Sequence, residues 1–300
     1  METKIKLQTV YQSYYVDDTH QDTSMTQRHK RSETEYDASG KIVTDIQYDQ
    51  NGLAETKTLN TYDKSGNLIR SEVYDFVEDV SEVFETEWNE KGQKLTEKKI
   101  YTDGSFDLSR WEYDTHFFSI KKTTYDPDNE IEQIVSFIHV ENKIQKEITK
   151  DSDGEIILED EYEYDIHGNV ILHIHSSIEE GYSRTEHQYN ESGKRIFSVS
   201  TDEDGDVIEK TKIEELEDGS GISMTEESSA GIAYYKISND ETGRMLQQEE
   251  YNEDNTLISS IQRQYLPNGH ISRTLGMMYR PEYDTEQYYS IDYKYDFFEN

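Results

Sequence analysis

Three histidines lie close together in the sequence, where two successive strands are expected. His173 and His175 are separated by one residue, and His187 follows on the next expected strand. If the chain reverses near Glu180, His173 lies opposite His187 and all three imidazoles share one face of a sheet. Imidazoles on adjacent strands suit a metal ion. We keep the three as a candidate metal site; the alternative is surface imidazoles on a polar face, and no metal or other cofactor is predicted.

A second candidate is an acidic turn. Asp202, Asp204 and Asp206 alternate as the carboxylates at the start of a calcium loop do. An EF-hand loop requires Gly at its sixth position and Glu at its twelfth, where this chain has Val207 and Ile213. We therefore interpret the segment as a solvated acidic turn, with weak opportunistic calcium binding as the alternative.

Tyrosines recur near the expected turns. A repeated Tyr can stack on sugars or anchor a protein partner, because an aromatic ring supplies contact area at low entropy cost. A residue present in every repeat is first of all a packing residue, so both interpretations stay open. The familiar nucleophile, zinc-protease, phosphate-loop and dinucleotide motifs are absent from the sequence, and no catalytic residue or enzyme activity is predicted.

The tyrosines belong to an internal repeat, Tyr-Asp or Tyr-Asn followed by two variable residues and then Gly. Gly accepts positive φ and Asp or Asn closes a local side-chain turn, so this pattern predicts chain reversal. Apolar β-formers follow each copy, which predicts strands between the turns. The clearest repeat positions are Tyr36, Gly40, Tyr48, Gly52, Tyr62, Gly66, Tyr164, Gly168, Tyr189 and Gly193.

Weaker turn clusters extend the series at intervals of about 12 to 13 residues, so that one unit is one strand and one turn. This spacing predicts an all-β fold, a long antiparallel meander of about 22 short strands. Strand twist makes a flat sheet improbable, and we expect an elongated twisted sheet or an open spiral shell. The expected organisation is a single repeat domain over residues 5–296, with less regular capping ends at 1–35 and 270–300.

Charge and composition limit the partners. The 300 residues include 30 basic and 65 acidic side chains, a net charge of −35. Nucleic acid and anionic membranes are therefore unfavourable partners, and a basic partner is favoured. There is no Cys, which excludes disulfides and thiolate ligands. Apolar residues are sparse, so a thin core is expected. The start of the chain has too little apolar length for a signal peptide, and a cytoplasmic location is expected.

Residues 162–171, Tyr-Glu-Tyr-Asp-Ile-His-Gly-Asn-Val-Ile, resemble the YD repeat of RHS proteins, as do residues 62–68. In that family the repeats form long coiled sheets that encapsulate a toxin or line a shell. The chain has no region that reads as a toxin domain and is too short to build such a shell alone. The Tyr and Gly spacing is also similar to that of MORN-type antitoxins. Both resemblances imply a binding scaffold connected with toxin systems.

The function expected from these features is a non-enzymatic scaffold, an immunity protein or antitoxin that neutralises a basic secreted toxin and is a monomer when free. A cell-surface YD-repeat protein with a structural or carbohydrate-binding role is the alternative. High acidity also keeps an exposed sheet soluble, which is the simpler reading of the charge. The candidate partner-binding residues are Asp202, Asp204, Asp206, Glu214, Glu215, Glu217 and Asp218.

Overall fold

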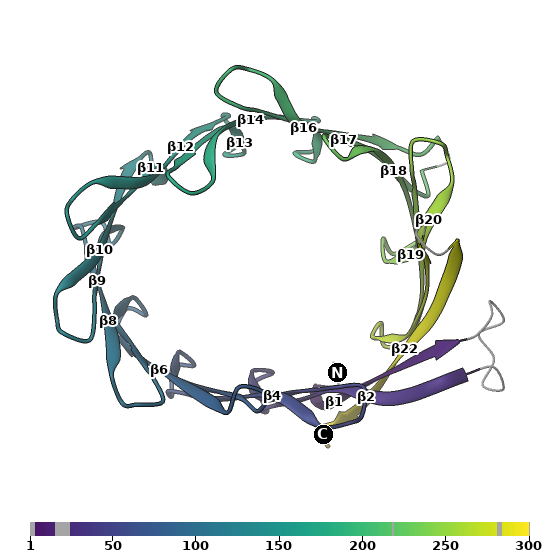
Figure 1. Ribbon diagram of the computed structural model, residues 1–300, viewed down its shortest axis with the longest axis horizontal. Coiled ribbons are helices and arrows are strands. Elements are labelled where there is room, and N and C mark those ends of the chain that lie inside the picture. The colour runs from purple at the N-terminus through teal and green to yellow at the C-terminus, as the bar shows by residue number, and fades with distance from the viewer. Residues whose placement is uncertain (1–3, 16–24, 218, 281–283, 300) are drawn as a thin grey trace. The chain divides into compact units, whose positions relative to one another are not determined.

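The computed structural model of the chain consists of antiparallel β-strands joined by short turns (Figure 1). It describes residues 4–15, 25–217, 219–280 and 284–299. Within these residues there are 22 strands and no helix, so the predicted all-β class and strand number are confirmed. No helical segment in this part of the chain could therefore cross a bilayer.

The strands follow one another along the chain at short intervals. They are β1 (Ile5–Tyr15), β2 (Met25–Tyr36), β3 (Ile42–Tyr48), β4 (Ala54–Tyr62), β5 (Leu68–Asp75), β6 (Val80–Trp88), β7 (Lys94–Ile100), β8 (Phe106–Tyr113), β9 (Ser119–Tyr125), β10 (Ile131–Val140), β11 (Lys143–Asp151), β12 (Ile156–Tyr164), β13 (Val170–Ser177), β14 (Gly181–Tyr189), β15 (Arg195–Thr201), β16 (Val207–Glu215), β17 (Gly221–Ser228), β18 (Gly231–Asn239), β19 (Met245–Tyr251), β20 (Leu257–Tyr265), β21 (Ile271–Arg280) and β22 (Thr285–Phe297).

One side-chain oxygen organises each repeated turn. Between β12 and β13, Asp165 Oδ1 accepts hydrogen bonds from the backbone amides of His167 and Asn169, both at 2.9 Å. Gly168 donates its amide to the Asp165 carbonyl oxygen and has a φ of +93°, which strains any residue with a Cβ. The same pair of amide bonds recurs at Asp37, Asp49, Asn89, Asp114, Asp126, Asp151, Asn190, Asp202 and Asp240.

Rings at the ends of many even-numbered strands bind the preceding strand. Tyr164 donates its hydroxyl to the carbonyl oxygen of Ile144 at 2.7 Å, and Tyr189 does the same to Val170 at 2.8 Å. Equivalent bonds to a backbone carbonyl are made by Trp88, Tyr113, His139, Tyr265 and Tyr295. The hydrogen-bonding unit is therefore a pair of strands, because the bond appears at alternate strand ends.

The described residues divide into two compact units. Unit 1 comprises residues 1–59, 73–79 and 213–300, and unit 2 comprises residues 60–72 and 80–212. Nothing in this division tests the expected single domain over 5–296 with capping ends at 1–35 and 270–300, which stays a prediction.

In unit 1 the first and last strands are neighbours. β1 pairs antiparallel with β2 on one side and with β22 on the other, from Ile5 opposite Phe297 to Tyr15 opposite Tyr288 (Figure 1). The strand order therefore closes, and the predicted open sheet or open spiral is wrong. Turn spacing is the same in an open and a closed meander; whether the ends meet depends on accumulated twist, which the spacing does not encode.

Side chains of Tyr15, Ser290, Arg273 and Asp292 support the pairing of β1 with β22. We call this strand pair and these side chains the seam. The hydroxyls of Tyr15 and Ser290 lie 3.0 Å apart, and both residues are buried. Arg273 donates from Nη2 to the Tyr15 hydroxyl at 2.8 Å and contacts Asp292 through Nε. The seam is thus polar as well as buried, and its hydroxyls are hydrogen-bonded.

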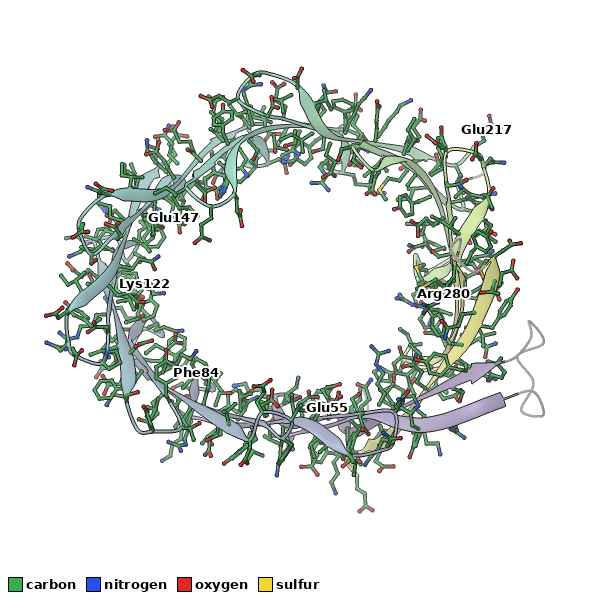
Figure 2. The ribbon with its side chains drawn as sticks, in the orientation of Figure 1. Glu55, Phe84, Lys122, Glu147, Glu217 and Arg280 are labelled. Carbon is green, nitrogen blue, oxygen red and sulfur yellow. The ribbon has the colours of Figure 1, made fainter. Side chains whose placement is uncertain are left out.

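In unit 2, strands β6 to β15 each pair antiparallel with the next. Following these registers from strand to strand places Phe84, Lys122 and Glu147 on one face of the sheet, in agreement with Figure 2. Continuing to β14, the same face carries Asp160, His173, His175 and His187. We call this surface the histidine face.

The core is thin. Among the described residues only Val10, Tyr15, Val135 and Met277 are buried apolar or aromatic side chains. The other buried side chains are small hydroxyl residues such as Thr123 and Thr149. Backbone pairing along the strands therefore carries much of the organisation of the sheet.

Candidate functional site: a carboxylate shared by two histidines

The hairpin of β12 and β13 brings a carboxylate to the histidines. The two strands fold back around the Asp165 turn, and the register places Asp160 opposite His175 and Tyr162 opposite His173. Residues two apart on a strand point to the same face. Asp160, Tyr162, His173 and His175 therefore form a group of neighbours on the histidine face.

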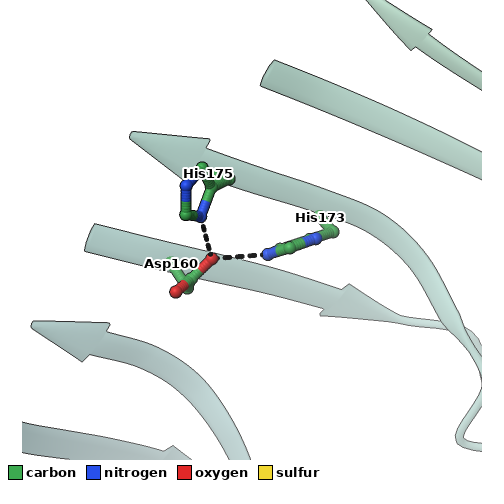
Figure 3. Close-up of side chains that lie close together, drawn as sticks. All are labelled: Asp160, His173 and His175. Atoms are coloured by element: carbon green, nitrogen blue, oxygen red, sulfur yellow. Dashed lines mark hydrogen bonds and ion pairs between the residues drawn. The ribbon is translucent and has the colours of Figure 1, made fainter. Parts of the chain in front are cut away.

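Both imidazoles contact one oxygen of the carboxylate (Figure 3). His173 Nε2 lies 2.6 Å from Asp160 Oδ1, and His175 Nδ1 lies 2.9 Å from the same oxygen. The exposed fractions of the side chains are 13% for Asp160, 17% for His175 and 31% for His173. The cluster is thus half-buried and open on one side to solvent.

The surrounding side chains restrict the rings. The ring of His173 stacks on Tyr162, with centroids 4.7 Å apart and planes within 3° of parallel. The second nitrogen of His175, Nε2, lies 3.3 Å from a carboxylate oxygen of Glu180, which reaches in from the turn after β13. Stacking therefore restrains the ring of His173, whereas Glu180 lies within ion-pair distance of His175 without making a hydrogen bond to its Nε2.

The histidine face is negative at this point. Glu147 on β11 lies directly opposite Asp160. Burial raises the pKa of Glu147 above its ordinary value, and the charge of Asp160 raises it further, while Lys122 lowers it. The neighbourhood thus holds three carboxylates, those of Asp160, Glu147 and Glu180, with one nearby lysine, Lys122.

His187 lies near the cluster but outside it. Its predicted place opposite His173 is wrong, because Thr185 occupies that position and His187 is two residues further along β14. Its Nδ1 lies 3.0 Å from the Ser198 hydroxyl. Burial lowers the pKa of the His187 imidazole, with smaller contributions from the charges of Arg195 and His173.

Sequence reasoning missed Asp160. The third member of the cluster comes from the preceding strand, not from the following one. Equal steps away from the paired residues Tyr164 and Val170 would put Ile174 opposite Asp160, but a register shift between Glu163 and Tyr164 puts His175 there instead. Asp160, His173 and His175 are also the only group of three such donors close enough to hold a metal ion in the part of the chain that the structure describes.

The acidic segment has two parts, one in each unit. In unit 2, Asp202 Oδ1 accepts the amides of Asp204 and Asp206, at 3.1 Å and 2.8 Å, so its carboxylate is part of the turn. The Asp204 and Asp206 side chains are exposed. Val207 and Ile208 at the start of the following strand are 56% and 43% exposed, and the first residues of other strands, such as Ile131 and Ile156, are exposed as well. Carboxylates and apolar side chains thus stand side by side there.

In unit 1, Glu214, Glu215 and Glu217 are exposed on and after the end of β16. Asp218 lies outside the described residues. The structure therefore describes this part of the predicted partner-binding set as solvent-exposed carboxylates.

The repeat tyrosines make contacts within the fold. Tyr164 and Tyr189 bind backbone carbonyls, as described above, and Tyr36 donates to Gln8 Oε1 at 3.2 Å. The Lys30 ammonium lies 4.1 Å from the centre of the Tyr48 ring. Tyr62 ends β4, and the repeat glycines Gly40, Gly52, Gly66, Gly168 and Gly193 all have positive φ. These contacts fit the packing interpretation of the tyrosines.

Comparison with known proteins finds similarity at the level of structure only. No family model and no curated protein matches the chain. A crystal structure of TcdB2-TccC3-TEV has 14% identity and a TM-score of 0.34, over 82% of this chain and 15% of that chain. For TcdB2-TccC3-Cdc42 the identity is 11% and the TM-score 0.31, over 91% and 19% of the two chains.

A porin-like protein from Bacteroides uniformis has 7% identity and a TM-score of 0.37, over 99% of both chains. This chain spans less than a fifth of the TcdB2-TccC3 chains. With similarities this low, the YD-repeat resemblance remains one of sequence motifs.

Proposed function

We propose that the protein is a non-enzymatic binding scaffold for a basic protein. The observation that carries this proposal is the start of β16, where the exposed apolar side chains of Val207 and Ile208 adjoin the exposed carboxylates of Asp204 and Asp206. Exposed apolar residues bordered by charge are typical of protein-binding surfaces. Arg and Lys match such a surface, because their aliphatic stems cover apolar groups while their cationic ends meet carboxylates.

The charge of the whole chain supports a basic partner. A net charge of −35 attracts a cationic protein over distances comparable to the Debye length and accelerates encounter. The same charge repels nucleic acid and anionic membranes. Asp204 and Asp206 are then the residues that a cationic partner meets first on this part of unit 2.

The narrower proposal is an immunity protein or antitoxin that neutralises a basic secreted toxin. It rests on the resemblance of residues 162–171 to the YD repeat and on the charge. In this proposal the protein is a monomer when free and acts in the cytoplasm. Its mechanism is occupation of the toxin surface, with no chemical step.

The test begins with the product of the neighbouring gene, co-expressed with this chain. The association rate is then measured from about 10 mM to about 300 mM salt, over which the Debye length falls from about 30 Å to under about 8 Å. We expect association to slow strongly and dissociation to change less. A rate that does not depend on salt contradicts the electrostatic part of the proposal.

Variants locate the surface. The double variant Asp204→Asn/Asp206→Asn should slow association, and Val207→Ser/Ile208→Ser should speed dissociation. The matched control is Glu253→Gln/Asp254→Asn, which removes two exposed charges from the same kind of turn between β19 and β20, where Leu257 at the start of the following strand is not exposed. Equal effects of the test and control variants would show that the binding surface is not at residues 204–208. If the chain retains no protein partner and instead binds to a glycan array, the carbohydrate-binding alternative is supported.

A further inference from the structure

The donor atoms of Asp160, His173 and His175 are close enough for one ion. One ligand atom from each residue lies within 4.8 Å of the other two. A zinc-like ion has bonds of about 2.0 to 2.2 Å to nitrogen and oxygen, so its donor atoms stand about 3 to 3.5 Å apart. Small side-chain rotations are enough to reach that arrangement, because His173 Nε2 and His175 Nδ1 already converge on one oxygen of Asp160.

The donor types select a class of ion. Two imidazole nitrogens and one carboxylate oxygen suit divalent zinc, cobalt, nickel or copper. Calcium and magnesium favour sites made of oxygen ligands. The cluster therefore fits a transition-metal ion better than an alkaline-earth ion.

The cluster is also prepared for binding. His173 and His175 are two residues apart on β13, and Asp160 is on the paired strand, so the backbone holds all three on one face. The stacking of Tyr162 orients the ring of His173, and the Glu180 carboxylate lies 3.3 Å from His175 Nε2, a buried nitrogen that still lacks a hydrogen bond. A carboxylate at the outer nitrogen of a metal-bound histidine is the usual support for such a ligand.

Electrostatics favours a cation here. Asp160 lies opposite Glu147, and the chain as a whole carries a charge of −35. Lys122 is the nearby opposing charge, and it interacts with Glu147. The summed field raises the local concentration of divalent cations.

We infer that Asp160, His173 and His175 bind one divalent transition-metal ion. The ion joins β12 to β13, with three protein ligands and a remaining coordination position for water. This site is independent of the proposed partner surface at residues 204–208, so either proposal can fail without the other.

The experiment uses the full chain without a histidine tag and Co2+ as the probe. Titration followed by visible absorption and by calorimetry should give one Co2+ per chain with the ligand-field bands of a nitrogen and oxygen site. His173→Gln and Asp160→Asn should each weaken binding by more than the about 10- to 100-fold that loss of an outer hydrogen-bond partner costs. The matched control is His187→Gln, which removes an imidazole from the same face outside the cluster.

The control variant should retain the affinity and the absorption bands of the unmodified chain. Absence of a stoichiometric Co2+ site overturns the inference, and so does an equal loss of binding in His187→Gln. Circular dichroism checks that each variant is folded. If His173→Gln does not fold, Asp160→Asn decides, because it keeps the size of the side chain: full Co2+ affinity in this variant overturns the inference.

Discussion

His139 donates a hydrogen bond from Nε2 to the carbonyl oxygen of Ser119 over 2.8 Å. Tyr113 and Tyr164 make the equivalent bond with their hydroxyls, to Lys94 and Ile144. An imidazole therefore does in β10 what a phenol does in β8 and β12. The role of the repeat ring is to donate to the start of the preceding strand, and more than one side chain can fill it.

The first prediction tests this bond. Tyr164→Phe should lower the free energy of unfolding by about 0.5 to 1.5 kcal/mol, the usual net value of one hydrogen bond. His139→Tyr should cause no loss, because the hydroxyl can replace the imidazole donor. Urea unfolding gives both values. Tyr182→Phe is the control, because Tyr182 is not among the rings that bond to the preceding strand, and an equal loss there would refute the role of the bond.

The second prediction concerns two glycines that the turn repeat does not explain. A Cβ at Gly221 would lie 1.8 Å from the backbone carbonyl oxygen of Ile237, whereas a Cβ at Gly276 would meet the ring of Tyr289. A ring can move and a paired backbone cannot without separating strands. Gly221→Ala should therefore cost about 3 kcal/mol or more, and Gly276→Ala about 1 kcal/mol.

Unfolding in urea measures both glycine variants. Replacing Tyr289 by Leu should reduce the cost of Gly276→Ala, since the Cβ then has space. The same replacement should leave the cost of Gly221→Ala unchanged. If Gly221→Ala proves as mild as Gly276→Ala, the close approach of β17 to β18 is not as described.

The third prediction concerns the loss of stability at low pH. The hydrogen bonds from the Asn169 side chain and from backbone amides hold the pKa of Asp165 below its ordinary value of 3.8. A lowered folded-state pKa means that the stabilisation is present above the unfolded-state pKa and is lost as pH falls through the folded-state pKa. The protein should therefore lose stability below about pH 4.

Asp165→Asn should reduce this acid dependence, because Asn keeps the acceptor oxygen but does not titrate. Asp204→Asn is the charge-matched control, since its side chain is exposed and outside the set of turn acceptors. Urea unfolding at a series of pH values makes the comparison. The turn explanation fails if the two variants change the pH profile equally.

The fourth prediction follows from the seam. Deleting residues 1–15 removes the partner of β22 on one side, so backbone amides of β22 opposite β1 should exchange faster with solvent. The new unpaired edges should also promote self-association. Hydrogen exchange and sedimentation measure these effects. In an open sheet β22 would be indifferent to the deletion, and that result would refute the closure.

The local structure was readable from the sequence. Asp165 and Gly168 predict a turn by their own chemistry, one by supplying a side-chain acceptor and the other by tolerating positive φ. The strands between turns follow from alternating apolar and polar residues. These signals act within a few residues, so no long-range information was needed for the all-β class or the strand number.

The register of the strand pairs around His173 could not be predicted from the sequence pattern. The turn between β13 and β14 carries no YD motif, and a shift of the assumed reversal point exchanged Thr185 for His187 opposite His173. The turn between β12 and β13 does carry the motif, yet a register shift between Glu163 and Tyr164 decides that His175, and not Ile174, lies opposite Asp160. The motif thus locates the chain reversal, whereas the exact cross-strand neighbours depend on register shifts such as those before Tyr164 and Tyr189.

By itself, the sequence determined where the chain turns, which residues face together along a strand and how acidic the surface is, because these depend on local chemistry and composition. Only the tertiary structure decided that Tyr15 meets Ser290 and that one oxygen of Asp160 serves two imidazoles. Both contacts depend on the twist and coiling accumulated over strands and on exact registers, and these quantities are set by packing across the sheet.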